Sequence, residues 1–530
     1  MTVTIDDKTL EEHYSKFLNR YVDRRVILQF WDDYLPKDVK PHPNPYVLAA
    51  GMPNEGLFPV ESVHVNVVER PFQHLEYPFK SEKIHVGAAG ETGINEAEYV
   101  KSRVDDGSMV DIWRYDPSHG DNIPIAQALQ YSDTKGFPQL IDFSKKLVSY
   151  LNNPAYDNWD VMLANGSSDS LSKVFTTLTD EDVTVLMEEF TFTPTISNVT
   201  ANGGIPIPLK VDITDDASQQ GINVEYMDQL LDNWSTGEYS HLSKPRLLYT
   251  IVTGQNPTGM TQCDEKRQKI YDLCEKHDII IVEDDPYGYL KFLPFDKSDP
   301  LKNQYNDGTI TFDKYCKEIL APSYLTIDTS GRVIRLETFS KVFAPGMRLS
   351  FIVANKFILD KLLKYADISV RSPCGLAQAM TINIIDKWAE NFNGDKVRAW
   401  LSWVMKVAGE YTHRRNVLFQ ALEATPAYKE ELFELIEPSA GMFISIKINF
   451  DKFGEISDKL KAMNFLNYKL LEEGCIVILG YRMAVDKKFS YDRSNFLRIT
   501  FAMAPDEEHL QTAAERLGKG VERFFKEYHN

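Results

Sequence analysis

One lysine in this sequence has neighbours that would let its amine react with an aldehyde. Lys341 lies in VIRLETFSKVFAPGMRLSF, between two apolar strand-like segments, with an arginine seven residues after it. A lysine amine becomes a nucleophile near neutral pH only when burial or a nearby cation lowers its pKa, and the mouth of a sheet supplies both. Thr338, Ser340 and Arg348 add two hydroxyl donors and a fixed cation, which suit a phosphate dianion. A solvated turn would have the same short pattern, so other segments must decide.

Two further segments place polar groups where an expected strand ends. ANGSSDSLSKVF puts Ser167 and Ser168 between a strand and a helix, where free N–H groups and the helix dipole attract an anion. Simple N-capping by a serine is the alternative there. TGQNPTG puts Asn256 in a proline turn after a buried strand, which an ordinary Asx turn would also explain.

The segment IIIVEDDPYGYL places acids directly after an apolar strand. Open α/β sheets bind ligands at the carboxyl ends of their strands, so a carboxylate is expected at the binding edge. We expect this to be Asp284, with Tyr287 close by, because a buried carboxylate would suit a protonated pyridine nitrogen. A magnesium site built from Glu283, Asp284 and Asp285 is a weaker alternative, because no GxxxxGK phosphate loop accompanies it.

A single arginine, Arg498, lies in the apolar strand-like segment FLRITFA. Its guanidinium could clamp a carboxylate with two hydrogen bonds. Its aliphatic stem could equally carry the charge out to solvent.

These residues need strands and turns to bring them together. Apolar runs rich in Val, Ile and Leu predict strands covered on both faces, as in a mainly parallel sheet, at 159–166, 183–190, 246–252, 279–285 and 333–339. The segment 261–278 has an acidic start, a basic end and one apolar face, so it predicts a crossover helix. The sequence therefore predicts an α/β fold.

The pattern also divides the chain. We expect residues 1–60 to be an N-terminal segment that joins a small domain, and residues 61–124 to be an insertion. Residues 125–373 would form the large domain, with a polar insertion at about 292–324, and residues 374–530 a smaller C-terminal α+β domain.

Composition excludes several classes of protein. A net charge of -19 disfavours nucleic acid or an anionic membrane as the main partner. No stretch approaches the roughly 20 apolar residues of a membrane span. The five cysteines are scattered, without CxxC pairs or histidines at metal spacing, so we expect reduced thiols and no metal. With no targeting signal at either end, the expected location is the cytoplasm, or the nucleus as well.

Taken together, these motifs resemble the pyridoxal-phosphate-dependent aminotransferases of fold type I. NGSSDSLSKVF, QNPTG, EDDPY, ETFSKVFAPGMR and LRITFA follow one another in family order, and the resemblance runs from AAGMPNEGLFP to FLRITFA. The subgroup is that of the aromatic amino acid and 2-aminoadipate (kynurenine-type) aminotransferases. The resemblance implies pyridoxal 5'-phosphate as cofactor, and transfer of an amino group from an L-amino acid to a 2-oxo acid, which we expect to be 2-oxoglutarate.

The resemblance also assigns roles to residues. Lys341 would bind the cofactor covalently and move the proton, and Asp284 would keep the pyridine nitrogen protonated. The other expected cofactor contacts are Ser167, Ser168, Thr338, Ser340 and Arg348 at the phosphate, Tyr287 and Asn256 at the ring oxygen, and Phe192 on the ring face. Arg498 and Asn256 would bind the substrate's α-carboxylate side. Tyr131 matches a tyrosine that reaches the phosphate of the neighbouring subunit, which implies a homodimer.

Two positions depart from the nearest relatives. Phe192 stands where a tyrosine is more usual, so stacking is kept and a hydroxyl is lost. AAG replaces the commoner GG before the N-terminal loop, and Gly51 alone would allow close backbone approach to the substrate. Two other functions stay open: a lyase of the cysteine-conjugate β-lyase type, and a non-catalytic ligand-sensing module.

Overall fold

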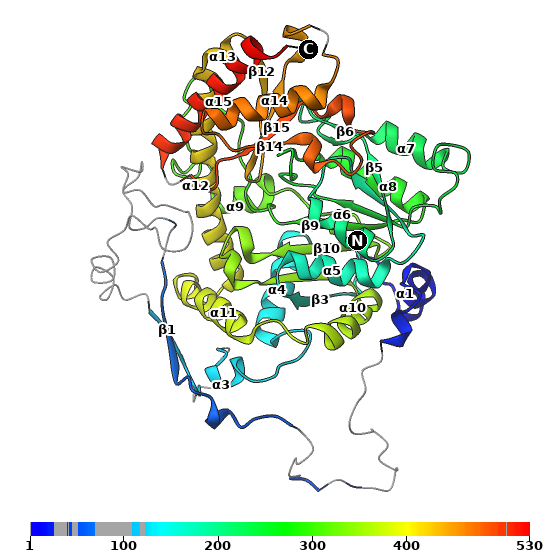
Figure 1. Ribbon diagram of the computed structural model, residues 1–530. Coiled ribbons are helices and arrows are strands. Elements are labelled where there is room, and N and C mark those ends of the chain that lie inside the picture. The colour runs from blue at the N-terminus through cyan, green and yellow to red at the C-terminus, as the bar shows by residue number, and fades with distance from the viewer. Residues whose placement is uncertain are drawn as a thin grey trace.

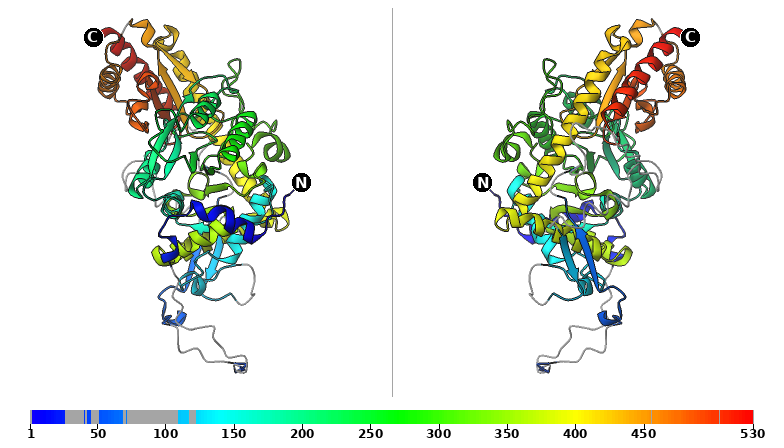
Figure 2. Two further views of the ribbon diagram at one scale, coloured as in Figure 1. Left: turned by 90° about the vertical axis from the view of Figure 1, so that its right-hand side faces the viewer. Right: turned by 90° about the vertical axis from the view of Figure 1, so that its left-hand side faces the viewer.

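The computed structural model describes residues 2–25, 40, 42–44, 51–68, 71, 109–116, 122–454, 456–504 and 506–529. A seven-stranded sheet forms the centre of a larger domain, and a four-stranded sheet that of a smaller C-terminal domain (Figure 1). The side views place the C-terminal domain at one end of the molecule (Figure 2). The expected fold class, a large α/β domain followed by a smaller α+β domain, is confirmed.

The large sheet is mainly parallel, as expected. Its spatial order is β3 (Trp159–Ala164), β11 (Ser350–Asn355), β10 (Val333–Thr338), β9 (Ile280–Asp285), β8 (Leu247–Thr250), β4 (Thr184–Glu188) and β5 (Ile205–Leu209). Strands β10, β9, β8, β4 and β5 run parallel to one another, whereas β11 is antiparallel to both β10 and β3. All five strands predicted from their apolar runs are present.

Helices cover both faces of this sheet, which explains why its strands are apolar throughout. In β9, Ile281 packs into one core cluster, while Ile280 and Val282 pack into the other. The first face is covered by α4 (Pro138–Leu151), α7 (Val224–Asp232), α8 (Asp264–Lys276), α11 (Gly375–Ala389) and the first half of α12 (Lys396–Ala424). The second is covered by α1 (Asp7–Tyr14), α5 (Ser167–Leu178), α6 (Thr193–Ala201) and α10 (Lys356–Ser369). Helix α8 confirms the predicted crossover helix.

The smaller domain is an antiparallel sheet packed against helices. Its strand order is β12 (Phe433–Ile436), β13 (Phe443–Ile448), β15 (Phe496–Thr500) and β14 (Ile478–Leu479). The helices are α13 (Pro426–Lys429), α14 (Lys459–Glu472) and α15 (Glu507–Glu527), together with the second half of α12.

The expected boundary at residue 374 is wrong. Ile382 and Ile385 of α11 lie in the core of the larger domain, as does Trp400 of α12. Leu422, near the end of the same helix, lies in the core of the smaller domain. The change of domain therefore falls within α12, where no break in the helical pattern marks it.

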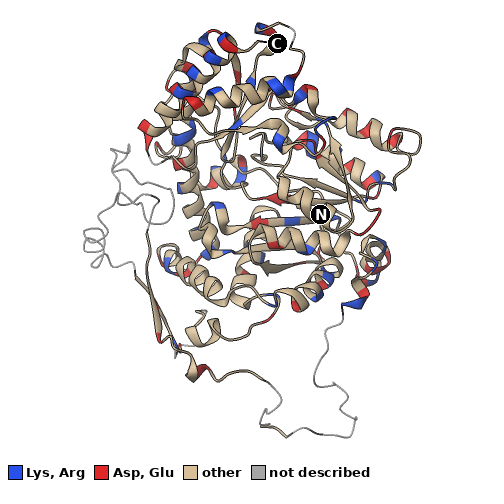
Figure 3. Cartoon of the chain, viewed as in Figure 1, with Lys and Arg blue, Asp and Glu red and all other residues tan. Residues whose placement is uncertain are grey.

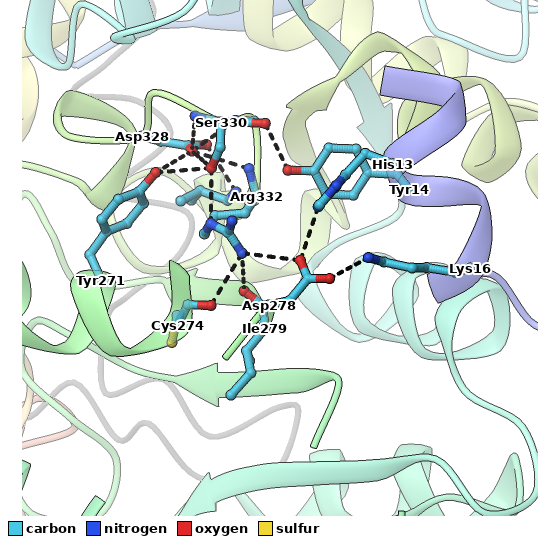
Figure 4. A network of polar contacts seen from close by, with 12 residues as sticks. His13, Tyr14, Lys16, Tyr271, Cys274, Asp278, Ile279, Asp328, Ser330 and Arg332 are labelled. Carbon is cyan, nitrogen blue, oxygen red and sulfur yellow. Dashed lines mark hydrogen bonds and ion pairs between the residues drawn. The ribbon is translucent and has the colours of Figure 1, made fainter. Parts of the chain in front are cut away.

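The expectation that the N-terminal segment joins the small domain is also wrong for residues 2–25. Leu10, Tyr14 and Phe17 are buried in the larger domain, beside α10. Polar contacts fix the same helix end: the Tyr14 hydroxyl donates to the Ser330 carbonyl at 2.7 Å, and His13 Nε2 lies 2.9 Å from Asp278 Oδ1 (Figure 4). Lys16 also forms an ion pair with Asp278.

That residues 61–124 and 292–324 are insertions stays a prediction. Of residues 61–124, the described parts include an antiparallel ribbon of β1 (Ser62–Asn66) and β2 (Met109–Trp113); residues 69–70, 72–108 and 117–121 lie outside the described residues. The segment 292–324 includes α9 (Phe312–Lys314) and packs Tyr315 and Tyr324 fully into the larger core. The remaining short elements are α3 (Ile125–Ala128), β6 (Val211–Asp212) and β7 (Gly221–Ile222).

Acidic and basic side chains intermix along the described helices instead of separating by sign (Figure 3). On α14 and α15, for example, Arg523 contacts both Glu472 and Glu527, at 2.6 and 2.9 Å. Among the helices that the structure describes, none is both long and apolar enough to cross a membrane. All five cysteines are free thiols, as expected.

We predict that Tyr14→Ala frees α1 from the larger domain. The change removes a buried aromatic ring and its hydrogen bond, and truncations of this kind cost about 3–5 kcal/mol. Hydrogen exchange of the α1 amides should become much faster than in the unaltered chain. The control is Tyr21→Ala, because Tyr21 is exposed and belongs to the same segment. Equal exchange in both variants would show that α1 is held by other contacts.

Candidate active site

Several expected site residues meet at one edge of the large sheet. Strands β3, β8, β9 and β10 all end at this edge, because they run in the same direction. Ser167 follows β3, Asn256 follows β8, Asp284 lies near the end of β9, and Lys341 follows β10. Brought together in this way, they occupy the position at which open α/β sheets bind ligands.

Asp284 is the buried acid of the site. It is 3% exposed, and its Oδ2 atom accepts a hydrogen bond of 2.7 Å from the Tyr249 hydroxyl. Its Oδ1 atom is also buried but has no hydrogen-bond partner within the described part of the chain. Burial raises the pKa of Asp284 to about 7, although the Tyr249 hydrogen bond and Lys341 oppose that rise. A buried carboxylate oxygen without a donor is costly, so Oδ1 is suited to a donor that the chain does not supply.

Lys341 lies in the short 3₁₀ turn Phe339–Lys341 that follows β10. Burial and the positive charge of Arg348 lower the pKa of Lys341, whereas Asp284 acts in the opposite direction. The amine is therefore uncharged at a lower pH than a free lysine would be, which is the condition for nucleophilic attack.

A candidate phosphate site lies at the start of α5. The N-cap residue is Gly166, with φ at +82°, and no side chain caps the helix, so the serine-capping alternative is wrong. Ser167 and the exposed Ser168 are the first two helical residues. A Cβ atom at Gly166 would collide with the guanidinium of Arg348, so this glycine makes room for the cation at the helix N-terminus. Free N–H groups and a guanidinium together favour an anion here.

The two hydroxyls before Lys341 lie at the same edge. The Thr338 hydroxyl lies 2.9 Å from the Ser340 hydroxyl, and the Ser340 N–H donates to Thr338 Oγ1 at 3.2 Å. Thr338 is buried and Ser340 is half-buried. Thr338 therefore orients the turn, and Ser340 is the more accessible of the two hydroxyls.

Arg498, on β15 of the smaller domain, reaches the larger domain. Its Nη1 atom donates to Asn256 Oδ1 at 2.8 Å, and its guanidinium lies 4.5 Å from the centre of the Phe443 ring. These contacts show that the Arg498 side chain does not simply extend to solvent. They also show that the Asn256 side chain contacts the other domain, which an ordinary Asx turn would not require. Tyr287 is buried nearby; burial and the charge of Asp284 raise its pKa, and Arg498 lowers it.

Phe192 lies at the N-cap of α6, beside the end of β4. Its ring is partly buried and packs against the same core cluster that contains Tyr249 and Tyr287. Stacking of the Phe192 ring on a cofactor stays a prediction.

Two expected residues are not brought into this arrangement. Tyr131 is 68% exposed, and among the described residues, chain neighbours aside, no atom lies within 4 Å of the point where a Cβ on Gly51 would lie. The two segments lie side by side, because Gln130 Nε2 donates to the Pro53 carbonyl at 2.7 Å. The role expected of Tyr131 is a contact with the neighbouring subunit, and the role expected of Gly51 is a contact with the substrate, so both stay predictions.

The magnesium alternative at residues 283–285 is not supported by the geometry. Successive side chains of a strand point to opposite faces, so Asp284 is separated from its two neighbours. Glu283 and Asp285 instead bind Arg335, at 3.0 and 2.5 Å. In the described part of the chain, the three acids do not form a cluster of metal ligands.

The residues fit pyridoxal 5'-phosphate. The unpartnered Oδ1 of Asp284 can accept from a protonated ring nitrogen, and the N-terminus of α5 with the Arg348 guanidinium beside it can bind a phosphate. The charges of Arg348 and Asp284 both act on Lys341: Arg348 lowers its pKa and Asp284 raises it. Lys341 is therefore near both the expected phosphate site and the expected partner of the ring nitrogen.

Two buried groups were missed from the sequence. Tyr249, which binds Asp284, lies in the apolar run RLLYTIV. Its hydroxyl is a polar group in an otherwise apolar strand, and this could have indicated that it needs a buried partner. Glu188 is 1% exposed and takes hydrogen bonds from Gln255 Nε2 at 3.0 Å and from the Ile251 N–H at 3.2 Å. Because no cation pairs with it among the described residues, burial raises the pKa of Glu188 to about 7. It supports the loop that carries Asn256.

Comparisons with known proteins agree with this geometry. Residues 125–517 match the family "Aminotransferase class I and II". The chain is 45% identical to aromatic amino acid aminotransferase 2 of Saccharomyces cerevisiae, over 99% of this chain and 98% of that protein. It is 32% identical to an aromatic amino acid aminotransferase of Schizosaccharomyces pombe, over 77% of this chain and 82% of that protein.

The crystal structure of the aromatic aminotransferase Aro9 from C. albicans superposes with a TM-score of 0.84 at 37% identity, covering 97% of this chain and 98% of that one. This chain therefore belongs to the class I and II aminotransferase family.

Proposed function

We propose that this enzyme transfers the amino group of an aromatic L-amino acid to 2-oxoglutarate, with pyridoxal 5'-phosphate as its cofactor. The observation that carries the proposal is the convergence of Lys341, the unpartnered oxygen of Asp284 and the Arg498–Asn256 pair on one sheet edge. The names of the two yeast relatives and of the C. albicans structure support an aromatic donor.

The cofactor, when bound, supplies a carbonyl that combines with amines and a ring that accepts electrons from the substrate's α carbon. Asp284 would hold the ring nitrogen in its protonated form through Oδ1. The Arg348 guanidinium, the α5 N-terminus and Ser340 would hold the phosphate. Lys341 Nζ would take the proton from the substrate's α carbon, because its lowered pKa leaves it able to accept one.

Arg498 would bind the α-carboxylate. Its guanidinium is oriented by Asn256, a neutral amide, so its positive charge is not cancelled by an acidic partner. Phe443 packs against the guanidinium face, which leaves its edge for hydrogen bonds.

We also propose that the enzyme is a homodimer whose subunits share their active sites. The support is a group of large apolar side chains that are exposed on and near the segments of Gly51 and Tyr131: Met52, Leu57, Met109, Trp113, Tyr115, Leu129 and Tyr131. Exposed apolar surface of this kind marks interaction sites. A second subunit would cover it and bring Tyr131 to the neighbouring site.

We predict that Lys341→Ala lowers kcat by about a thousandfold, the usual contribution of a positioned proton-transfer group. The assay combines phenylalanine with 2-oxoglutarate and measures glutamate. The control is Lys291→Met, since burial lowers the pKa of Lys291 to about 8 but the residue lies outside the site. Release of pyruvate from a cysteine conjugate faster than glutamate formation would favour the lyase alternative instead.

We predict that Arg498→Lys reduces the preference for an amino acid over its decarboxylated amine. Loss of a bidentate, charge-assisted contact should raise KM for phenylalanine by about 10- to 100-fold. KM for phenethylamine, which has no carboxylate, should stay within about twofold. The control is Arg493→Lys, whose guanidinium is already bound by Glu189. A parallel rise for both substrates would show that Arg498 does not bind the carboxylate.

Shared sites predict complementation between inactive variants. Lys341→Ala and Tyr131→Ala subunits should each be impaired alone, and mixing them after dissociation should restore activity. In the mixed dimer, one site combines an intact Lys341 with an intact Tyr131 from the other subunit. If Tyr131 instead serves its own subunit, no mixed dimer has an intact site, and activity stays at the level of the separate variants.

A further inference from the structure

We propose that Tyr249 is a positioning residue, whose hydroxyl binds one oxygen of Asp284 and so leaves the other oxygen for the cofactor's ring nitrogen. This inference rests on the proposed use of pyridoxal 5'-phosphate. It assigns a role to a residue that lies in the next strand and would not itself touch the reacting atoms.

The two side chains form a buried pair at the centre of the sheet. Tyr249 is on β8 and Asp284 on β9, which are neighbouring parallel strands. Tyr249 is fully buried and Asp284 is 3% exposed, so water does not compete for their 2.7 Å hydrogen bond. Within the described residues, the Tyr249 hydroxyl donates to Oδ2 of Asp284, and no group donates to Oδ1.

The direction of this hydrogen bond is fixed. Burial, followed by the charge of Asp284, raises the pKa of Tyr249 far above its usual value, so the phenol keeps its proton. The hydroxyl therefore donates and Oδ2 accepts. While Asp284 is ionised, Oδ1 is therefore the oxygen that stays available to a protonated ring nitrogen.

The other charged groups around Asp284 do not replace this contact. Lys341 and Arg335 lower the pKa of Asp284 only through their charges, and Asp285 raises it. Tyr287, which also faces Asp284, is held protonated by burial. Among the described residues no ion pair involves Asp284, while Arg335 is taken up by Glu283 and Asp285 on the opposite face of the sheet.

Loss of the hydroxyl should therefore have two effects. Oδ2 would lose its donor, so the carboxyl group could rotate and its orientation toward the ring nitrogen would no longer be fixed. The pKa of Asp284 would also rise, since the Tyr249 hydrogen bond lowers it. At neutral pH a larger fraction of Asp284 would then be neutral, and a neutral carboxyl group stabilises a protonated ring nitrogen less than a carboxylate does.

The experiment compares the unaltered enzyme with Tyr249→Phe, in which the isosteric ring preserves packing. Apoenzyme is titrated with pyridoxal 5'-phosphate from pH 6 to 9, and binding is followed by cofactor absorbance. We expect about tenfold weaker binding near neutral pH, the size of one hydrogen bond to a charged group. Because the folded-state pKa of Asp284 rises, the loss of affinity on acidification should begin at a higher pH in the variant.

The matched control is Tyr289→Phe. Tyr289 is likewise a buried tyrosine that donates to a buried carboxylate, Glu337, but it faces the other core of the sheet. Its replacement should lower the unfolding temperature by a similar amount while leaving cofactor affinity and its pH dependence unchanged.

A second ligand separates positioning from a structural role. A pyridoxal-phosphate analogue whose ring nitrogen is replaced by C–H cannot donate to Asp284, so the unaltered enzyme and Tyr249→Phe should bind it within about twofold of each other. Equal weakening for both ligands, or the same effect in Tyr289→Phe, would overturn the inference. If the unaltered apoenzyme fails to bind pyridoxal 5'-phosphate at all, the proposed function itself fails.

Discussion

The structure of the site depends on one buried carboxyl group at the end of a central strand. Asp284 lies in β9, the middle strand of seven, where both faces of the sheet are covered by helices. Burial of an ionised carboxylate is costly unless donors or cations compensate it. The chain supplies Tyr249 for one oxygen and the charge of Lys341 nearby, and leaves the other oxygen for a ligand. Within the described chain, Asp284 is thus left with one oxygen for a donor that the proposed cofactor would supply.

On the opposite face of the same end of β9, buried carboxylates are compensated by groups of the chain itself. Arg335 binds Glu283 and Asp285 there, and also lies 3.3 Å from Glu337, so one cation faces three acids. Burial raises the pKa of Glu283 and Glu337, and the Ser323 and Tyr289 hydroxyls donate to these two groups. The EDD sequence is therefore divided between a self-sufficient structural network and a ligand site. Strand alternation alone makes that division.

The sequence predicted those elements of the fold that depend on neighbouring residues alone. The apolar runs gave the strands, and the acidic and basic ends of α8 gave its limits. By contrast, β5 lay outside the expected strands because IPIPL contains two prolines, which only an edge strand tolerates. The domain boundary was misplaced because α12 is regular across it, and α1 was misplaced because its hydrogen-bond partner Ser330 is 316 residues away. Among the site residues, Lys341 and Asp284 were recognisable from their strand ends. Tyr249 was not, because its role depends on which strand lies beside β9.

The site also joins two domains, and the kind of contact at the junction matters. Glu189 and Arg493 form a bidentate pair across it, between residues 304 positions apart, and there the two charges satisfy each other. Arg498 lies five residues further on, and its partner across the same junction is the amide of Asn256. An acid at that position would hold the two domains together equally well but would compete with a substrate carboxylate for the guanidinium. An amide orients the arginine without neutralising it, so one contact fixes the strand and the other leaves a positive charge for the substrate.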